Sequence, residues 1–167
     1  MKRLTFIILV ISLIFLTGCG FYNLDNFVLP DDLEFIEVVE SLDTPEKICV
    51  YMEENFTYEA HPYYTPDPYT FWKSKKGDCN DFSTFATFIA NYHGYEVYQI
   101  IIVFNDCKHF LGVYSENHFS FSDNWLYCRE YMTFKDIVKV DSVLQGKEWV
   151  NYKVFNYNMD IIEKGVN

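Results

Sequence analysis

The clearest periodic pattern of the chain lies in its middle and is helical. Apolar side chains recur there at intervals of three and four residues, at Phe82, Phe85, Ala86, Ile89 and Ala90. This spacing predicts a helix over residues 79–93 with one buried face. Asp78 is a favourable N-cap, Asp81 takes the capping-box position, and Gly94 suits the left-handed C-cap. Cys79 is therefore expected in the first turn of this helix.

After this helix the pattern changes to strands joined by short polar turns. Residues 95–104 are rich in β-branched and aromatic side chains and predict one strand. A second strand is expected over 108–114 and a third over 118–122. Because the connections are short, neighbouring strands are predicted to be antiparallel. His109 begins the second strand and Asp123 follows the third, so both are expected at the same end of the hairpin.

Two further helices are predicted before the central one. Apolar residues recur at helical spacing from Leu33 to Val39. A second helix fits residues 44–55, because Thr44 can cap its start and Pro45 suits its first position.

Residues 57–71 are predicted to form a loop. Prolines at positions 62, 66 and 68 disfavour both a helix and a central strand. The segment is rich in tyrosine and comes shortly before the helix that carries Cys79. Two interpretations stay open: the loop is a wall of a substrate site, or it is a packed surface loop.

The C-terminal part completes a mixed fold. Residues 133–138 fit a short helix, and residues 149–156 fit a closing strand. With the preceding elements they predict the α+β class, in which helices pack on an antiparallel sheet and Cys79 lies at a helix N-terminus. The chain contains no internal repeat, so residues 31–167 are expected to form a single domain.

The composition indicates an acidic folded domain. Half of the 167 residues are hydrophobic and 20% are aromatic. This excludes a disordered chain, because burial of so much apolar surface offsets chain entropy. The net charge of −11 argues against a nucleic-acid partner, since basic side chains would have to replace the counterions of the phosphates.

The start of the chain has the layout of a secretory signal. A short basic stretch precedes residues 4–16, an apolar run that is shorter than the roughly 20 residues needed to span a bilayer. Residues 16–19, Leu-Thr-Gly-Cys, resemble the lipobox of bacterial lipoproteins at all four positions. That resemblance implies a signal peptide over 1–18, lipidation of Cys19, and an extracytoplasmic protein held on a bacterial membrane by a short stalk over 19–30. An ordinary signal peptide and an uncleaved anchor are the alternatives.

The position of Cys79 has chemical consequences. Free amides and the helix dipole at a helix N-terminus favour an anion, so they lower the pKa of a thiol and populate the nucleophilic thiolate. Asp78 and Asp81 act in the opposite direction, because negative charge disfavours the thiolate. A protonated histidine near Cys79 would have to outweigh them.

Four histidines compete for that role. His109 is the candidate that its strand position favours, with Asp123 to orient its ring. His93 is excluded, because it lies about 20 Å from the start of the helix at a rise of about 1.5 Å per residue. His118, in the next strand, stays a rival, and His61 is expected to be exposed in the proline-rich loop.

These residues together resemble the transglutaminase-like superfamily, a branch of the papain-like cysteine enzymes. The resemblance is carried by residues 77–83, Gly-Asp-Cys-Asn-Asp-Phe-Ser, at a helix start, by His109 at a strand start and by Asp123 after the next strand. It extends over roughly residues 44–127. It implies that Cys79 attacks a carboxamide, that His109 is the general base and that Asp123 orients the imidazole.

The resemblance also indicates what else the site needs. The oxyanion is expected to meet the backbone amide of Cys79 and one upstream donor, either Trp72 or Tyr58. Asp106 and Asp141 are the alternatives to the orienting carboxylate. No cofactor is implied, and the sequence holds no zinc or calcium motif, although some members of the family depend on calcium.

The activity that the resemblance implies is acyl transfer from peptide or glutamine-type amides. Hydrolysis, by a protease or amidase, is expected rather than cross-linking. The expected partners are a peptide or protein amide and the membrane that holds the lipidated Cys19. A catalytically inactive binding module with the same fold and a structural lipoprotein with inert thiols are the alternatives.

Three cysteines remain after Cys19 and Cys79 have been assigned. Outside the cytoplasm, Cys107 could form a disulfide with Cys128 across the sheet. Alternatively these two and Cys49 all stay reduced.

Overall fold

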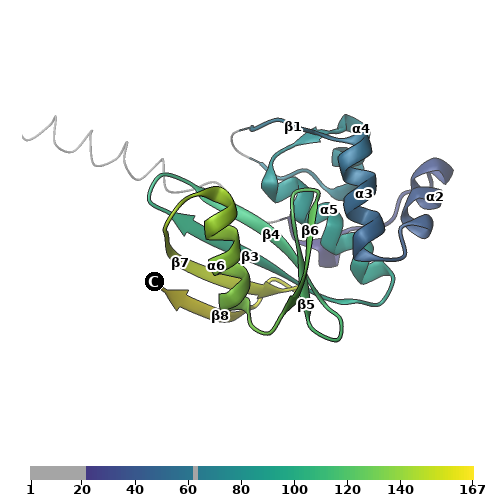
Figure 1. Cartoon of the computed structure of the whole chain (residues 1–167). Coiled ribbons are helices and arrows are strands. Elements are labelled where there is room, and N and C mark those ends of the chain that lie inside the picture. Colours follow the sequence, from purple (N-terminus) through teal and green to yellow (C-terminus); the bar gives the residue numbers. More distant parts are fainter. Residues whose placement is uncertain (1–21, 62–63) are drawn as a thin grey trace, which may run out of the picture.

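A six-stranded antiparallel sheet forms the framework of the structure, a computed structural model that describes residues 22–61 and 64–167 (Figure 1). Its strands, in spatial order, are β6 (Leu126–Tyr131), β5 (Phe119–Asp123), β4 (Lys108–Ser115), β3 (Glu96–Phe104), β7 (Trp149–Asn156) and β8 (Ile161–Val166). Every neighbouring pair is antiparallel. The four strands expected from the sequence are confirmed, as β3, β4, β5 and β7.

The two edge strands, β6 and β8, have no counterpart among the predicted elements. All of their residues are exposed or half-buried, so they lack the apolar alternation that reveals a half-buried strand. Because β8 pairs with β7, β7 lies inside the sheet and does not close it. The expectation that residues 149–156 form the closing strand is wrong in this respect.

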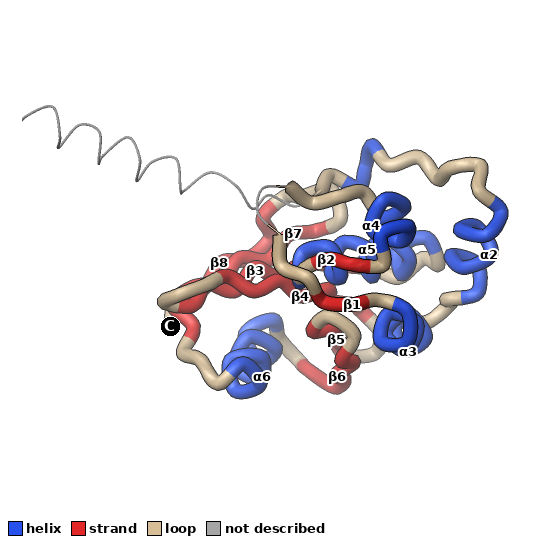
Figure 2. Tube along the Cα trace, turned by 90° about the horizontal axis from the view of Figure 1, so that it is seen from above, coloured by secondary structure: helices blue, strands red, loops and turns tan. Residues whose placement is uncertain are grey.

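The described residues form five α-helices, which cover both faces of the sheet. They are α2 (Leu33–Ser41), α3 (Pro45–Asn55), α4 (Pro68–Ser74), α5 (Cys79–Tyr92) and α6 (Phe134–Gln145). Two views at right angles show α5 on one face of the sheet and α6 on the other (Figures 1 and 2). The α+β fold predicted from the sequence is thereby confirmed.

Helix α5 is the centre of the larger helical layer. It packs on β3 and β4 with one side and on α3 and α4 with the other. Every residue from Cys79 to Ala90 is therefore buried, including the polar ones. The Thr87 hydroxyl, for example, donates to the Ser83 carbonyl oxygen at 2.8 Å and accepts from the Gln99 amide at 3.0 Å. The sequence predicted one buried face for this helix, whereas the structure buries the helix on all sides.

The two predicted helices before α5 are present, with one difference in the buried face. In α3, the Thr44 side chain accepts from the backbone amide of Lys47 at 3.3 Å, and Pro45 takes the first position, as predicted. In α2, Phe35 and Val39 are buried whereas Leu33 is 74% exposed. The apolar stripe of α2 is therefore centred on Phe35.

The segment predicted as one loop over residues 57–71 contains a short strand and the start of a helix. Strand β1 (Thr57–Tyr58) pairs in parallel with β2 (Lys76–Gly77), and α4 begins at Pro68. Proline is compatible with the first helical turn, because its missing amide hydrogen has no intrahelical partner there. The Asp67 side chain caps this helix by accepting from the backbone amide of Thr70 at 2.8 Å. The prediction of a loop is wrong at both ends of the segment.

Helix α6 has the predicted cap but is longer than predicted. Thr133 is its N-cap, and the helix continues to Gln145 instead of ending near residue 138. Asp141 interrupts its apolar pattern although this residue is fully buried. The additional turns carry two side chains that reach the candidate site described below.

The N-terminal residues of the described chain pack on the helices. Leu24, in the 3-10 turn η1 (Leu24–Asn26), is only 4% exposed, and the Phe27 ring lies 4.9 Å from the Phe88 ring. Part of the segment expected as a stalk over 19–30 therefore belongs to the folded domain. None of the helices formed by the described residues is both long and apolar enough to cross a membrane. The expected signal peptide and Cys19 lie outside the described residues.

Candidate active site

Cys79 is held at the first position of α5 by a reciprocal pair of cap interactions. The Asp78 side chain accepts from the backbone amide of Asn80 at 3.0 Å, and the Asp81 side chain accepts from the backbone amide of Asp78 at 2.8 Å. The predicted capping box is thus confirmed. Cys79 is 7% exposed, and its thiol lies where the unpaired amides and dipole of the helix favour a thiolate.

Gly77 has to be a glycine for this arrangement to form. A β-carbon at this position would lie 2.3 Å from the Asp81 Oδ2 atom and 2.7 Å from the Phe71 ring. The capping carboxylate therefore occupies the space that any other side chain would need.

His109 and Asp123 meet at one end of the β4–β5 hairpin. The His109 Nε2 atom donates to Asp123 Oδ1 at 2.7 Å, and both side chains are 11% exposed. His109 also lies within hydrogen-bonding reach of the Cys79 thiol. The structure therefore brings together the three residues that the sequence singled out, from α5, β4 and β5.

The surroundings of His109 favour its protonated form. Burial alone would lower the pKa of this imidazole. The hydrogen bonds with Asp123 and Cys79, together with the charge of Asp141, outweigh burial and raise the pKa above its ordinary value. A thiolate beside a protonated imidazole is the state in which a cysteine is nucleophilic at neutral pH.

Helix α6 adds two side chains to this site from the opposite face of the sheet. Asp141 Oδ1 lies 3.7 Å from His109 Nε2, and the Gln145 amide donates to Asp123 Oδ2 at 3.0 Å. The sequence offered Asp141 only as an alternative to Asp123, because the predicted helix over 133–138 ends before it. The sequence did not indicate Gln145, whose role depends on where α6 packs.

His61 is part of a second histidine–aspartate pair beside Cys79. Its Nε2 atom lies 2.6 Å from Asp81 Oδ2, and its side chain is 31% exposed, whereas that of Asp81 is fully buried. The expectation that His61 is an exposed loop residue is therefore wrong. Burial would lower the pKa of His61, but the hydrogen bond and charge of Asp81 outweigh it and raise the pKa. No local pattern in the sequence indicates this pair.

The remaining histidines lie away from Cys79. His118 is exposed between β4 and β5, at the end of the hairpin opposite to His109. His93 follows α5, where its Nε2 atom donates to the Val39 carbonyl oxygen at 2.8 Å. Among the described histidines, only His61 and His109 therefore lie beside the N-terminus of α5.

The two candidate oxyanion donors differ in their surroundings. The Trp72 indole is 4% exposed and donates its N–H to the Tyr51 hydroxyl at 2.8 Å. The indole N–H of Trp72 therefore already has an acceptor inside the protein. Tyr58, in β1, is 46% exposed. Burial, followed by the charges of Cys79 and Asp78, raises the pKa of Tyr58 to about 12, so its hydroxyl stays protonated near the thiol.

Two groups of side chains have the composition of possible metal ligands. In His61, Asp78 and Asp81, and in His109, Asp123 and Asp141, the potential ligand atoms lie within 4.8 Å of one another. In each group the histidine Nε2 atom already forms a hydrogen bond to a carboxylate. Calcium and magnesium prefer oxygen ligands, so neither donor set fits them well.

The four cysteines in the described part of the chain are free thiols. Cys49 and Cys79 are buried, Cys128 is half-buried and Cys107 is exposed. The disulfide considered between Cys107 and Cys128 is not formed in this structure. Of the two alternatives, the structure has the reduced form.

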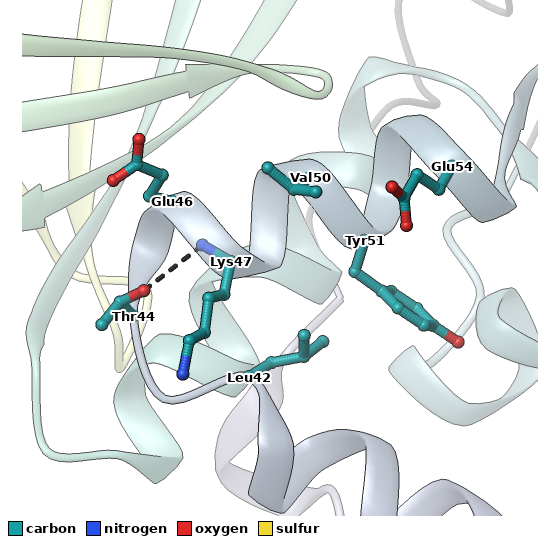
Figure 3. Close-up of a pocket in the computed structure, with 7 residues that line it drawn as sticks. All are labelled: Leu42, Thr44, Glu46, Lys47, Val50, Tyr51 and Glu54. Atoms are coloured by element: carbon teal, nitrogen blue, oxygen red, sulfur yellow. Dashed lines mark hydrogen bonds between the residues drawn. The ribbon is translucent and has the colours of Figure 1, made fainter.

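A cavity of about 490 Å³ lies beside α3, away from these residues. Figure 3 shows its lining, which includes the Thr44–Lys47 cap interaction and the Tyr51 ring. No lining residue belongs to the group around Cys79, so the cavity does not define the site.

The fold and the site define a class of protein. A cysteine at a helix N-terminus, packed against an antiparallel sheet that supplies histidine and aspartate, is the arrangement expected of papain-like cysteine enzymes. The sequence model of the transglutaminase-like superfamily matches residues 37–153, and the chain belongs to this superfamily.

Solved structures of LapG from Legionella pneumophila have a similar fold. One is 17% identical with a TM-score of 0.50, and the match covers 70% of each chain. An EGTA-treated form is 15% identical with a TM-score of 0.51, over 78% of this chain and 77% of LapG. A calcium-bound form is 17% identical with a TM-score of 0.49, over 70% of each chain. The comparison with curated proteins found no match.

Proposed function

We propose that the protein is a cysteine acyl-transfer enzyme that acts on peptide or glutamine-type amides. One observation carries the proposal: His109 joins Asp123 at 2.7 Å on one side and reaches the Cys79 thiol on the other. Membership of the transglutaminase-like superfamily supports the same chemistry.

In the proposed reaction, His109 takes the proton of the Cys79 thiol, and the thiolate sulfur forms a bond to the carbonyl carbon of the amide. Asp123 keeps the imidazole oriented and stabilises its protonated form. The oxygen of the tetrahedral intermediate accepts hydrogen bonds from the Cys79 backbone amide and the Tyr58 hydroxyl. The carbon–nitrogen bond then breaks, His109 returns its proton to the leaving amine, and a thioester remains on Cys79.

The thioester is resolved by water in the activity we propose. His109 then acts as general base for the water, and the acyl group leaves as a carboxylic acid. The enzyme is thus a protease or amidase rather than a cross-linking enzyme. An amine as acceptor would use the same residues and differ only in the molecule admitted to the site.

We further propose that the enzyme acts outside the cytoplasm, bound to a membrane through lipid on Cys19. The lipobox-like residues 16–19 support this anchor. The net charge of −11 disfavours binding to anionic lipid headgroups, so the acyl chains would hold the protein. Cys19→Ser is expected to release the protein from the membrane fraction and to abolish the incorporation of labelled fatty acid. Retention of both would contradict the anchor.

The pH dependence of alkylation at Cys79 tests the catalytic proposal without a known substrate. Peptide mass spectrometry resolves each thiol, and the exposed Cys107 is an internal reference in the same chain. Cys79 is expected to be alkylated faster than Cys107 in mild acid, and His109→Ala is expected to remove this advantage. Alkylation of Cys79 that is no faster than that of Cys107 and independent of His109 would favour a non-catalytic binding module.

A further inference from the structure

Two side chains of α6 lie behind the His109–Asp123 pair. Asp141 is fully buried, with its Oδ1 atom 3.7 Å from His109 Nε2. Gln145, one turn later, places its amide nitrogen 3.0 Å from Asp123 Oδ2 and 3.5 Å from Asp141 Oδ1. Because α6 and α5 cover opposite faces of the sheet, these contacts reach the histidine from the layer that does not carry Cys79 (Figures 1 and 2).

The hydrogen-bond geometry assigns a bridging role to the Gln145 amide. His109 Nε2 uses its hydrogen for Asp123 Oδ1, so it cannot also accept from Gln145 Nε2, which lies 3.4 Å away. The two amide hydrogens are therefore directed at the carboxylates of Asp123 and Asp141. One neutral side chain thus holds two acids of like charge next to the same imidazole.

The surroundings of Asp141 make a charged carboxylate costly at this position. Its Oδ2 atom is buried and has no hydrogen-bond partner among the described residues. Burying an acid in this way costs free energy, and an apolar or amide side chain would be less costly at the same position. Within the part of the chain that the structure describes, the cation paired with Asp141 is the His109 imidazole. The electrostatic benefit of this carboxylate therefore goes to His109.

We propose that Asp141 and Gln145 are positioning residues of the active site: the Asp141 carboxylate stabilises protonated His109, and the Gln145 amide holds Asp123 in the orientation that accepts from His109. This inference rests on the proposed function, because it extends the Cys79–His109–Asp123 group by two residues that do not touch a substrate.

The charges around His109 come from several elements. Cys79 faces it from α5, Asp123 from β5 and Asp141 from α6. Cys128, in β6, lies close enough to both acids that their charges add to burial in raising its pKa. Tyr58, in β1, stays protonated and is neutral. Asp141 is thus one of three groups that supply negative charge to the imidazole.

Asp141 changes its protonation state in a pH range in which its effect on His109 can be measured. Burial, more than the charge of Asp123, raises the pKa of Asp141 to about 6, against the opposing effect of His109. The carboxylate is therefore mainly ionised at neutral pH and protonated in mild acid. Its influence on His109 is expected to be full above this pKa and lost below it.

Titration of the imidazole nitrogens of His109 by ¹⁵N NMR in the full chain tests the proposal. Asp141→Asn is expected to lower the pKa of His109 by at least about one pH unit, because an opposite charge about 4 Å away is removed. Gln145→Ala is expected to slow alkylation of Cys79 at pH 6.5 several-fold and to lower the pKa of His109 by less than Asp141→Asn does, because Asp123 loses the donor that holds its orientation. Glu148→Gln removes an exposed carboxylate and is expected to change neither measurement.

Each result has a defined meaning. An unchanged pKa of His109 in folded Asp141→Asn overturns the role of Asp141, and an unchanged alkylation rate in Gln145→Ala overturns the role of Gln145. If Asp141→Asn does not fold, the ¹³Cγ resonance of Asp141 in the native protein decides, since it must respond when His109 loses its proton. If native His109 titrates near 6.5 and independently of Cys79, the proposed function itself fails. A raised native pKa that Asp141→Asn does not change overturns only this inference.

Discussion

Two histidine–aspartate pairs flank the N-terminus of α5, and they differ in how the chain builds them. The sheet pair, His109 and Asp123, comes from neighbouring strands, and both side chains are 11% exposed. The loop pair joins His61, between β1 and α4, to Asp81 in the first turn of α5. Their nitrogen–oxygen distances are 2.7 Å and 2.6 Å, so bond length alone does not distinguish the pairs.

The difference lies in what else each pair contacts. The histidine of the sheet pair reaches the Cys79 thiol, and its aspartate is held by Gln145. In the loop pair, Asp81 Oδ2 also accepts the backbone amide of Asp78, so the pair ties a loop to a helix cap. A histidine–aspartate hydrogen bond therefore does not identify a catalytic base by itself. The further contacts of each pair distinguish them. A pair whose histidine reaches a thiol can transfer a proton, whereas a pair whose aspartate accepts a backbone amide stabilises the local backbone.

The largest expected effect comes from breaking the sheet pair. Asp123→Asn should slow alkylation of Cys79 at pH 6.5 about 100-fold, because an unactivated thiol of pKa about 8.5 is only about 1% ionised at that pH. The melting temperature should change little, since asparagine keeps the size and one acceptor of the aspartate. A rate within a few-fold of the native one would show that the sheet pair does not activate the thiol.

Gly77→Ala should produce the next largest effect, and it acts on the loop pair. The added methyl group would overlap Asp81 Oδ2 and the Phe71 ring, and overpacking of this kind costs about 1–3 kcal/mol of unfolding free energy. Urea unfolding measures the loss, with the exposed Lys76→Ala as the matched control in the same strand. Equal stability of the two variants would contradict the close approach at Gly77.

Asp81→Ala should have an intermediate effect on stability. In contrast to Asp123→Asn, it should lower the unfolding free energy while changing the alkylation rate of Cys79 much less. It removes a helix cap interaction and the acceptor of His61, with an expected loss of about 1–2 kcal/mol in unfolding free energy. Alkylation of Cys79 should change less than about tenfold, because His109 keeps its partner. A loss of thiol reactivity as large as that of Asp123→Asn would place the loop pair in the catalytic machinery.

The smallest effect is expected from His61→Gln and should depend on pH. The folded-state pKa of His61 is raised, so the stability that its pair with Asp81 contributes is lost as pH rises through the folded pKa of His61. Burial raises the pKa of Asp81 to about 6, so the pair also weakens as pH falls through that value. The native protein should therefore be more stable than the variant near pH 7, by less than about 1 kcal/mol, with the difference vanishing in alkali. Melting temperatures from pH 7 to 10 measure it, with the exposed His118→Gln as control. A difference that grows with pH would have the wrong sign.

The sequence alone determined much of the site, because interactions between residues close in the chain set the positions of its residues on the helix and strands. The period of the apolar residues, the capping box of Asp78 and Asp81 and the β-branched strands each act over a few residues. They placed Cys79 at the start of a helix, and the short β4–β5 turn placed His109 and Asp123 at one end of a hairpin. Such features are readable without knowing how the elements pack.

Only the tertiary structure decided how side chains far apart in the sequence are combined. His61 meets Asp81 across 20 residues, and Gln145 meets Asp123 across 22. Trp72 became part of the core because α4, which the prolines obscured, packs its indole against Tyr51. The edge strands β6 and β8 likewise depend on pairing rather than on an apolar pattern. The physical reason is common to all of these cases: their stabilising contacts form only after the helices and strands have assembled, so no local spacing records them.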